Sequence, residues 1–248
     1  HHGANFLASH LATLIGANAV ITTAGDGVFC VALDSPNKGW KLANPEKAKF
    51  FMAGLLSGQK VNLQIEGGDG SWLRSSRIPF SSAGTLPIKI THKAIKINEK
   101  ALTYHPSILV LGIGCERNAE PSEIRELVDD VLKRTGLARE AIACVASIDI
   151  KMDERAIHEV ADYFGVSARF FSGEELERQK ERLANPSMAV YKEVGCHGVS
   201  EGAALAGVGE DGELLVEKTK SKRATVALAK AKSNINVELC GKGRGQLN

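Results

Sequence analysis

Residues that could bind or activate a polar substrate follow an apolar run near the middle of the chain. The segment 112–124 reads GIGCERNAEPSEI, and the apolar residues 108–113 lead into it. This order is typical of a strand, a glycine turn and the first turn of a helix, whose free N–H groups attract an anion. Gly112 and Gly114 permit close backbone approach, and Pro121 suits a first helical turn. An ordinary strand-to-helix turn is an equal alternative, because G-x-G without a third glycine is a weak signal.

Charged side chains occur in this first turn and in a second one. Glu116 and Arg117 follow the glycines, and the second turn, residues 147–154 (SIDIKMDE), places Asp149 and Lys151 two residues apart after an apolar run. In an open α/β sheet, ligands bind at the carboxyl ends of the strands. We therefore expect these side chains to lie at one edge of a sheet.

A third turn, residues 195–201 (GCHGVSE), opens a helix of small residues. His197 lies between its two glycines, and histidine acts as an acid, a base or a donor near neutral pH. Ser200 and Glu201 fall in the first helical turn, where capping is the default explanation and ligand contact the alternative. Cys115 lies near another helix N-terminus, which lowers a thiol pKa, so a covalent cysteine mechanism is a further alternative.

A basic cluster near the C-terminal end is a further candidate for ligand binding, depending on where it faces. Its members are Lys218, Lys220, Lys222 and Arg223. Such a cluster is more often a solvated hairpin than a site. If it faces the edge described above, it would meet a polyanionic ligand.

Composition narrows the class of protein. The chain has 248 residues, of which 44% are hydrophobic and 24% charged, and its net charge is +2. These values are typical of a globular protein and argue against nucleic acid as a partner. No apolar run is long enough for a membrane span, and no secretory signal opens the chain. Five scattered cysteines without a C-x-x-C pair predict neither disulfides nor zinc, so we expect a reducing, cytoplasmic setting.

From residue 107 onward, strand and helix patterns alternate. We expect strands at 108–113, 142–148, 168–171, 214–216 and 225–229, and helices at 121–135, 153–164, 174–182 and 199–206. Asp153 is expected to cap the second of these helices, and 188–194 is expected to be irregular or a strand. Single helices between strands favour a mostly parallel sheet with helices on both faces.

The residues before 107 have the pattern expected for part of a smaller α/β domain. We expect a helix at 7–15, strands at 19–22 and 60–65, one or two strands within 85–100, and a helix that Asn44 caps and Pro45 begins. The expected division is 1–66 for the end of an N-terminal domain and a middle segment, 67–106 for a linker or extended connection, 107–232 for the C-terminal α/β domain, and 233–248 for a tail.

Several stretches, taken in order, carry a resemblance to a known family. They are HHGANFLASHLATLIGANAVITTAG, NPEKAKFFMAGLLSGQKV, GIGCERNA, ASIDIKMDE, VGCHGVSEGAALAG and TVALAKA. Together they resemble the cobalt-precorrin-5A hydrolase family of cobalamin biosynthesis, over about residues 1–230. The resemblance implies that the chain is incomplete at its N-terminus. The tail is similar to the seam of fusions with a corrin-ring methyltransferase, so a precorrin methyltransferase, fused or in trans, is an expected partner.

The resemblance implies a hydrolytic reaction. The lactone of cobalt-precorrin-5A is opened, a carbon–carbon bond is broken, and a two-carbon fragment leaves as acetaldehyde to give cobalt-precorrin-5B. The substrate is a corrinoid macrocycle with many carboxylates, for which glycine loops, helix N-termini and basic side chains are suitable contacts. Cobalt belongs to the substrate, so we expect no metal or cofactor bound by the protein itself.

The residue roles are our own hypotheses, since the resemblance does not assign them. Lactone opening needs a base for water and donors for the developing oxyanion, and we expect His197 or Glu116 as the base. The expected substrate-binding residues are Gly112, Gly114, Cys115, Arg117, Asp149, Lys151, Ser200, Glu201, His1 and Asn5.

Two alternative functions stay open at this stage. One is a module that binds or carries a corrinoid intermediate without hydrolase activity, working with a methyltransferase. The other is an unrelated α/β enzyme that uses the glycine turn for a phosphate. Against the second, the chain contains neither G-x-G-x-x-G nor G-x-x-x-x-G-K-[ST].

Overall fold

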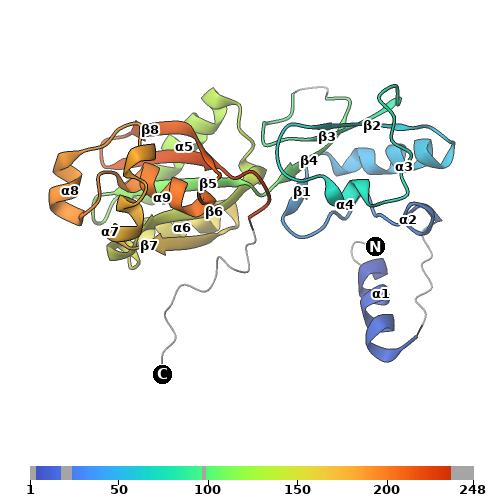
Figure 1. Cartoon of the computed structure of the whole chain (residues 1–248), viewed down its shortest axis with the longest axis horizontal. Helices are drawn as coiled ribbons and strands as arrows, with labels where there is room; N and C mark the ends of the chain where they lie inside the picture. Colours follow the sequence, from blue (N-terminus) through green and yellow to red (C-terminus); the bar gives the residue numbers. More distant parts are fainter. Residues whose placement is uncertain (1–3, 18–23, 97–98, 236–248) are drawn as a thin grey trace. The chain divides into compact units, whose positions relative to one another are not determined.

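The computed structural model describes residues 4–17, 24–96 and 99–235. The chain divides into two compact units, which we treat separately (Figure 1). Unit 1 holds residues 1–91 and 95–105, and unit 2 holds residues 92–94 and 106–248. The strand expected at 19–22 and most of the expected tail lie outside the described residues, as does His1.

Unit 1 is built around a four-stranded sheet. Its elements are α1 (Ala4–Ile15), α2 (Ala24–Phe29), β1 (Trp40–Leu42), the 3-10 turn η1 (Pro45–Lys47), α3 (Ala48–Leu56), β2 (Val61–Ile65), α4 (Ser71–Arg74), β3 (Leu86–Ile90) and β4 (Leu102–Pro106). The strand order is β1-β4-β3-β2, and β2, β3 and β4 run parallel. Buried apolar side chains, among them Phe51, Ile88 and Tyr104, form its core.

Two expectations for unit 1 need correction. The segment 67–106 contains β3 and β4, which pair with β2, so it belongs to the sheet rather than to an extended connection. Asn44 precedes the helical turn as expected, but its buried side chain makes no capping bond. The Asn44 amide instead donates to Ala101 O at 2.8 Å and accepts from Thr103 N–H at 3.0 Å. Its partners lie far away in sequence, which a local pattern does not reveal.

Unit 2 contains the three turns singled out above. Its elements are β5 (Leu109–Cys115), α5 (Pro121–Thr135), η2 (Arg139–Ala141), β6 (Ile142–Ile148), η3 (Asp149–Lys151), α6 (Arg155–Phe164), β7 (Ser167–Phe171), α7 (Gly173–Glu177), η4 (Lys180–Arg182), α8 (Met188–Val194), α9 (Val199–Val208), β8 (Glu213–Lys220) and β9 (Ala224–Lys230). The segment 188–194, expected to be irregular or a strand, is helix α8. Its start is capped by Ser187, whose hydroxyl accepts from Val190 N–H, and its end by Gly195 at a φ of 75°.

The sheet of unit 2 is mixed, which corrects the expectation of a mostly parallel sheet. Its order is β7-β6-β5-β9-β8. Strands β5, β6 and β7 run parallel, whereas β9 runs antiparallel to both β5 and β8. The cause is the short turn between Lys220 and Ala224, because so brief a connection joins only antiparallel neighbours.

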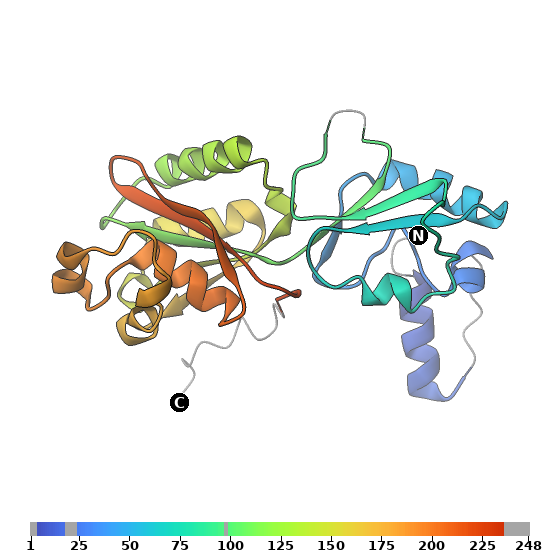
Figure 2. The same cartoon turned by 45° about the horizontal axis from the view of Figure 1, so that its top comes forward.

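Helices cover both faces of this sheet, as Figure 2 shows. Helices α5 and α6 pack on one face, and α9 packs on the other. The α9 contact is close because Gly112 has no side chain: a Cβ there would lie 1.9 Å from Ser200 O and 2.8 Å from Ala204 N. Gly112 is therefore required for the packing of α9 on β5.

Candidate functional site

The basic hairpin turn between β8 and β9 lies at the carboxyl end of β5. Arg223 donates from Nε to Glu116 at 3.0 Å, and from its two other nitrogens to the carbonyls of Arg117 at 2.9 Å and Asn118 at 3.1 Å. The basic cluster was expected to matter only if it faced this edge of the sheet. Arg223, one of its members, does so, because it holds the first turn in place. Lys218 is instead directed to Asn185 O, at 2.9 Å.

The second turn joins the first through Arg117. This guanidinium pairs with Asp153 and donates to Ile150 O, and the buried Glu154 accepts from the backbone N–H of Asn118 at 3.2 Å. The hydrogen bond from Arg117 lowers the pKa of Asp153. Asp153 is therefore an ion-pair partner of the first turn, and the expected helix cap is wrong, because α6 begins after Glu154 without a side-chain cap.

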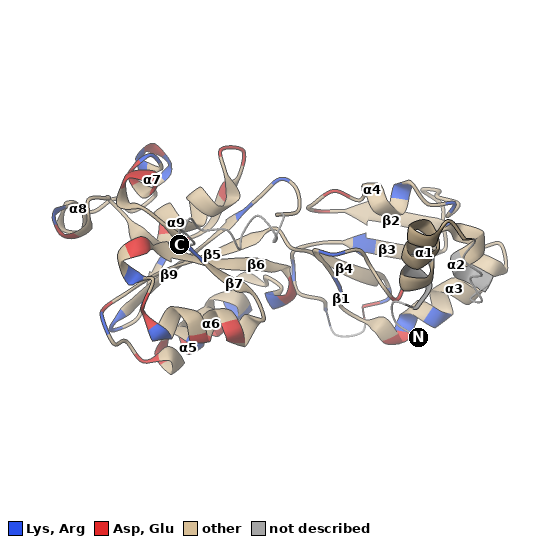
Figure 3. Cartoon of the chain, turned by 90° about the horizontal axis from the view of Figure 1, so that it is seen from below, with Lys and Arg blue, Asp and Glu red and all other residues tan. Residues whose placement is uncertain are grey.

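The η3 turn presents a cation between two apolar side chains. Ile150 and Met152 are exposed, and Lys151 between them is half-buried. Among the described residues, neither Lys151 nor Lys222 of the hairpin turn forms an ion pair. Figure 3 colours all lysines and arginines of the described chain blue and all acidic residues red. This edge therefore combines cationic groups with exposed apolar surface.

Cys115 at the end of β5 is not an activated thiol. Burial raises its pKa to about 11, although the nearby Lys151, Arg117 and Arg223 act in the opposite direction. A nucleophilic cysteine requires a depressed pKa. The covalent alternative therefore has no electrostatic support.

His197 is buried and paired with a carboxylate that the sequence patterns did not indicate. Its Nδ1 lies 2.8 and 2.9 Å from the two carboxylate oxygens of Glu177, which also accepts from the His197 backbone N–H at 3.0 Å. The hydrogen bond from His197 lowers the pKa of Glu177. On the other side of the ring, Nε2 lies 3.3 Å from Met188 Sδ, and the Tyr191 ring stacks at 4.5 Å.

Glu201 is a structural clamp rather than a cap. Its carboxylate, in a residue only 2% exposed, accepts from the N–H groups of Ala184, Asn185 and Lys218 and from the Asn185 side chain. Burial raises its pKa, but these four hydrogen bonds outweigh burial and the net pKa is lowered. Ser200 is buried too, and its Oγ has no hydrogen-bond partner in the described part of the chain.

Of the predicted residues of unit 2, those of the first turn and of η3 come together at the ends of β5 and β6, whereas Gly112 lies within β5 and is covered by α9. The start of α9 lies against the end of β5, since a Cβ on Gly114 would lie 3.4 Å from the Val199 side chain. Asp149 lies in η3 at the end of β6. Asn5 lies in α1 of unit 1, and its place in a common site stays a prediction. Glu177 was missed because only the fold brings it to His197, twenty residues away in sequence.

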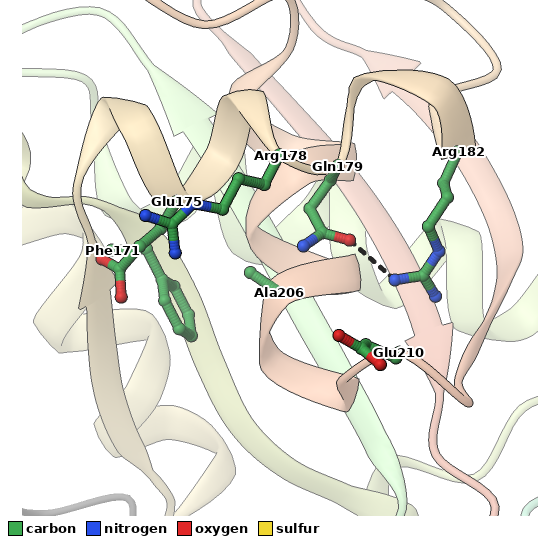
Figure 4. A pocket seen from close by; sticks show the side chains of 7 residues that line it. All are labelled: Phe171, Glu175, Arg178, Gln179, Arg182, Ala206 and Glu210. Atoms are coloured by element: carbon green, nitrogen blue, oxygen red, sulfur yellow. Dashed lines mark hydrogen bonds between the residues drawn. The ribbon is translucent and has the colours of Figure 1, made fainter.

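A surface groove of about 360 Å³ lies elsewhere on unit 2, and Figure 4 shows the residues that line it. They are Phe171, Glu175, Arg178, Gln179, Arg182, Ala206 and Glu210. Arg178 pairs with Glu174, and Arg182 donates to Gln179 and to two backbone carbonyls. The groove contains none of the predicted site residues, and its arginines serve the fold.

Two general features of the described residues bear on function. No helix within 4–17, 24–96 and 99–235 combines the length and apolar character required to cross a membrane. Over the same ranges, no three metal-ligating side chains of the His, Cys, Asp or Glu type come together.

The fold and the site define an α/β protein whose unit 2 carries a charged, partly apolar edge and, directly before α9, a buried His–Glu pair. Comparison with known proteins places it further. The family model "Cobalamin synthesis G C-terminus" matches residues 109–229. "Protein CobE" of Sinorhizobium sp is 46% identical over 121 residues, which cover 49% of this chain and 79% of that protein. The chain belongs to this cobalamin synthesis G family, which functions in cobalamin biosynthesis.

Similarity extends beyond unit 2. The "Cobalt-precorrin-5A hydrolase" of Priestia megaterium is 29% identical over 247 residues, covering 92% of this chain. This chain spans 65% of that relative's length. Among solved structures, that of CobE is 34% identical and covers 50% of this chain and 91% of its own, with a TM-score of 0.48. Family membership rests on the sequence match to CobE.

Proposed function

We propose that this chain hydrolyses cobalt-precorrin-5A. Water opens the lactone, the carbon–carbon bond to the two-carbon fragment breaks, and the fragment leaves as acetaldehyde, giving cobalt-precorrin-5B. The proposal is supported by the hydrolase of Priestia megaterium, whose similarity runs through both units. The observation that carries it is the edge at which the first turn, η3 and the basic hairpin meet.

The edge suits a macrocycle that bears carboxylates. The exposed side chains of Ile150 and Met152 offer apolar contact to the ring, while Lys151 and Lys222 have no ion pair among the described residues and offer charge. Arg117 already pairs with Asp153, so it contributes to binding mainly by holding the two turns together. Charge-assisted hydrogen bonds to carboxylates are stronger than neutral ones.

We assign the base to His197, with Glu116 as the alternative that the sequence left open. Glu177 accepts the Nδ1 proton and so leaves Nε2 as the basic atom, which is the arrangement of an oriented general base. Glu116 is exposed and engaged by Arg223. A substrate would have to displace the Arg223 guanidinium before this carboxylate could accept a proton.

The test is anaerobic incubation with cobalt-precorrin-5A while acetaldehyde is trapped and the macrocycle is followed by its absorbance. Hydrolysis predicts one acetaldehyde for each macrocycle converted. A macrocycle that stays bound and unchanged, with acetaldehyde at the level of the enzyme-free control, would refute the hydrolase.

A carrier of the corrinoid intermediate is the second candidate. It is favoured by one observation: the 46% identity to "Protein CobE" covers 121 residues, and the name of that protein assigns no reaction. The same incubation separates the two candidates, since a carrier binds the macrocycle without releasing acetaldehyde. A precorrin methyltransferase as partner stays a prediction.

A further inference from the structure

The segment 184–195, which we call the flap, lies over His197 without being part of the core. It contains α8, and none of its residues is buried, whereas Cys196, His197 and Gly198 directly after it are. In Figure 1, α8 lies at the periphery of unit 2, away from its sheet. A segment with so little buried surface opens at a lower free energy than the elements of the core.

The flap is attached mainly at its two ends. At its start, the N–H groups of Ala184 and Asn185 are held by the Glu201 carboxylate at 2.9 and 3.0 Å. At its end, Val194 packs against the core, and Gly195 turns the chain with a φ of 75°. These attachments are suitable as hinges because they fix the two ends of the flap, while no residue of α8 is itself buried.

Between its ends, the flap touches the body of unit 2 at His197. The Tyr191 ring stacks on the imidazole with centroids 4.5 Å apart, Met188 Sδ lies 3.3 Å from Nε2, and Ser187 N–H donates to His197 O at 2.7 Å. Met188 is itself 60% exposed and Tyr191 42%, whereas His197 is 7% exposed. Two partly solvated side chains thus keep solvent from the imidazole.

The contact between His197 Nε2 and Met188 Sδ is at best a weak hydrogen bond. With Nδ1–H directed to Glu177, Nε2 is an acceptor, and a thioether sulfur is also only a weak acceptor. Nε2 therefore lacks a good donor while the flap is closed. A hydroxyl or water that replaced Met188 would supply one, so the closed arrangement is readily displaced by a ligand that donates.

We propose that the flap opens to uncover His197 Nε2, and that Met188 and Tyr191 occupy the place which the substrate's reacting group takes in the open form. In this account Met188 and Tyr191 shield His197 in the closed form and leave it in the open form. The inference deepens the proposed function and rests on it, but the experiment below measures no turnover, so each can fail alone.

The experiment is acylation of histidines by diethyl pyrocarbonate, which attacks unprotonated imidazole, with each site located by peptide mass spectrometry. Exposed His10 in unit 1 is the internal reference. We expect His197 in the native chain to react at least about tenfold more slowly than His10, in line with protection by a segment that opens locally. Tyr191→Ala should raise the His197 rate severalfold and leave His10 unchanged, while Tyr191→Phe, which keeps the stack, should match the native chain.

Amide hydrogen exchange on the unaltered chain gives a second readout that does not depend on a variant folding. Amides of α8 should exchange much faster than those of α9. Equal protection of α8 and α9, or a His197 rate that Tyr191→Ala leaves unchanged, would overturn the flap. Flap opening observed together with no release of acetaldehyde would refute the hydrolase and leave the flap standing.

Discussion

Replacing Glu201 by glutamine tests the clamp that anchors both the flap and β8. The carboxylate accepts four hydrogen bonds of 2.8 to 3.0 Å, from Ala184, from Lys218 and, twice, from Asn185. Glutamine has nearly the same size, but only its oxygen accepts, and its NH₂ group would face N–H donors. Two of the four hydrogen bonds are therefore lost, and the charge that strengthens the others is removed.

The magnitude follows from these losses. A hydrogen bond to a charged group contributes about 1.5 to 3 kcal/mol, and orphaned donors add to the cost. Taking the lower value for two bonds, Glu201→Gln should lower the free energy of opening of unit 2 by about 3 kcal/mol, roughly a hundredfold in the opening constant. Hydrogen exchange of β5 and β9 amides measures this change. Glu193→Gln, at an exposed position of α8, is the matched control and should change little.

The stabilisation by Glu201 should also depend on pH, and it should weaken as the pH falls. The pKa of Glu201 is lowered in the folded chain, so its stabilisation is fully present above the pKa of an unfolded glutamate and is lost as the pH falls through the folded value. A protonated Glu201 resembles glutamine, so the difference between the native chain and Glu201→Gln should shrink in acid. A difference below about 1 kcal/mol at pH 7, less than one hydrogen bond to a charged group, or a difference that grows in acid, would refute the reasoning.

Three further predictions concern the edge and its packing. Since the pKa of Cys115 is about 11, only about one Cys115 thiol in ten thousand is ionised at pH 7. Iodoacetamide should therefore modify Cys115 far more slowly than the exposed Cys30. Because Cys115 is not expected to be a nucleophile, Cys115→Ser should keep full turnover. Gly112→Ala should destabilise the chain by about 3 kcal/mol, because the added Cβ would meet Ser200 O. The control Gly27→Ala, where the Cβ would point into open space, should leave the melting temperature nearly unchanged. Equal melting temperatures of the two variants would contradict the packing of α9 on β5. Arg223→Ala removes three hydrogen bonds to the first turn and should speed amide exchange at 116–118 about tenfold; unchanged exchange would mean that the turn is held by other contacts.

Helices and strands were predicted well where the sequence marks both of their ends. The helix at 121–135 and the strand at 142–148 have the expected bounds, because Pro121 begins that helix and Gly136 ends it in the left-handed region. The helix α8 was missed because its own sequence buries no residue, so its apolar pattern carries no clear period.

Pairings between distant segments were beyond the reach of sequence patterns. The antiparallel pairing of β8 and β9 follows from their short connecting turn, but the position of β9 beside β5 does not, because nothing in either strand's own sequence encodes that neighbour. The same holds for the site. The first two turns were predicted to share an edge, and the ion pair of Arg117 with Asp153 joins them, but the Glu177 partner of His197 follows only from the placement of α7 against α9.

The most direct measurement of the central claim is the rate of acetaldehyde release from cobalt-precorrin-5A by the native chain, His197→Asn and Glu116→Gln, followed anaerobically over a single turnover. The account predicts stoichiometric acetaldehyde from the native chain, a rate lowered at least about hundredfold in His197→Asn, as expected for loss of a general base, and a rate within about threefold of native in Glu116→Gln. Full turnover by His197→Asn would contradict the assignment of the base, and no acetaldehyde from the native chain would contradict the hydrolase itself.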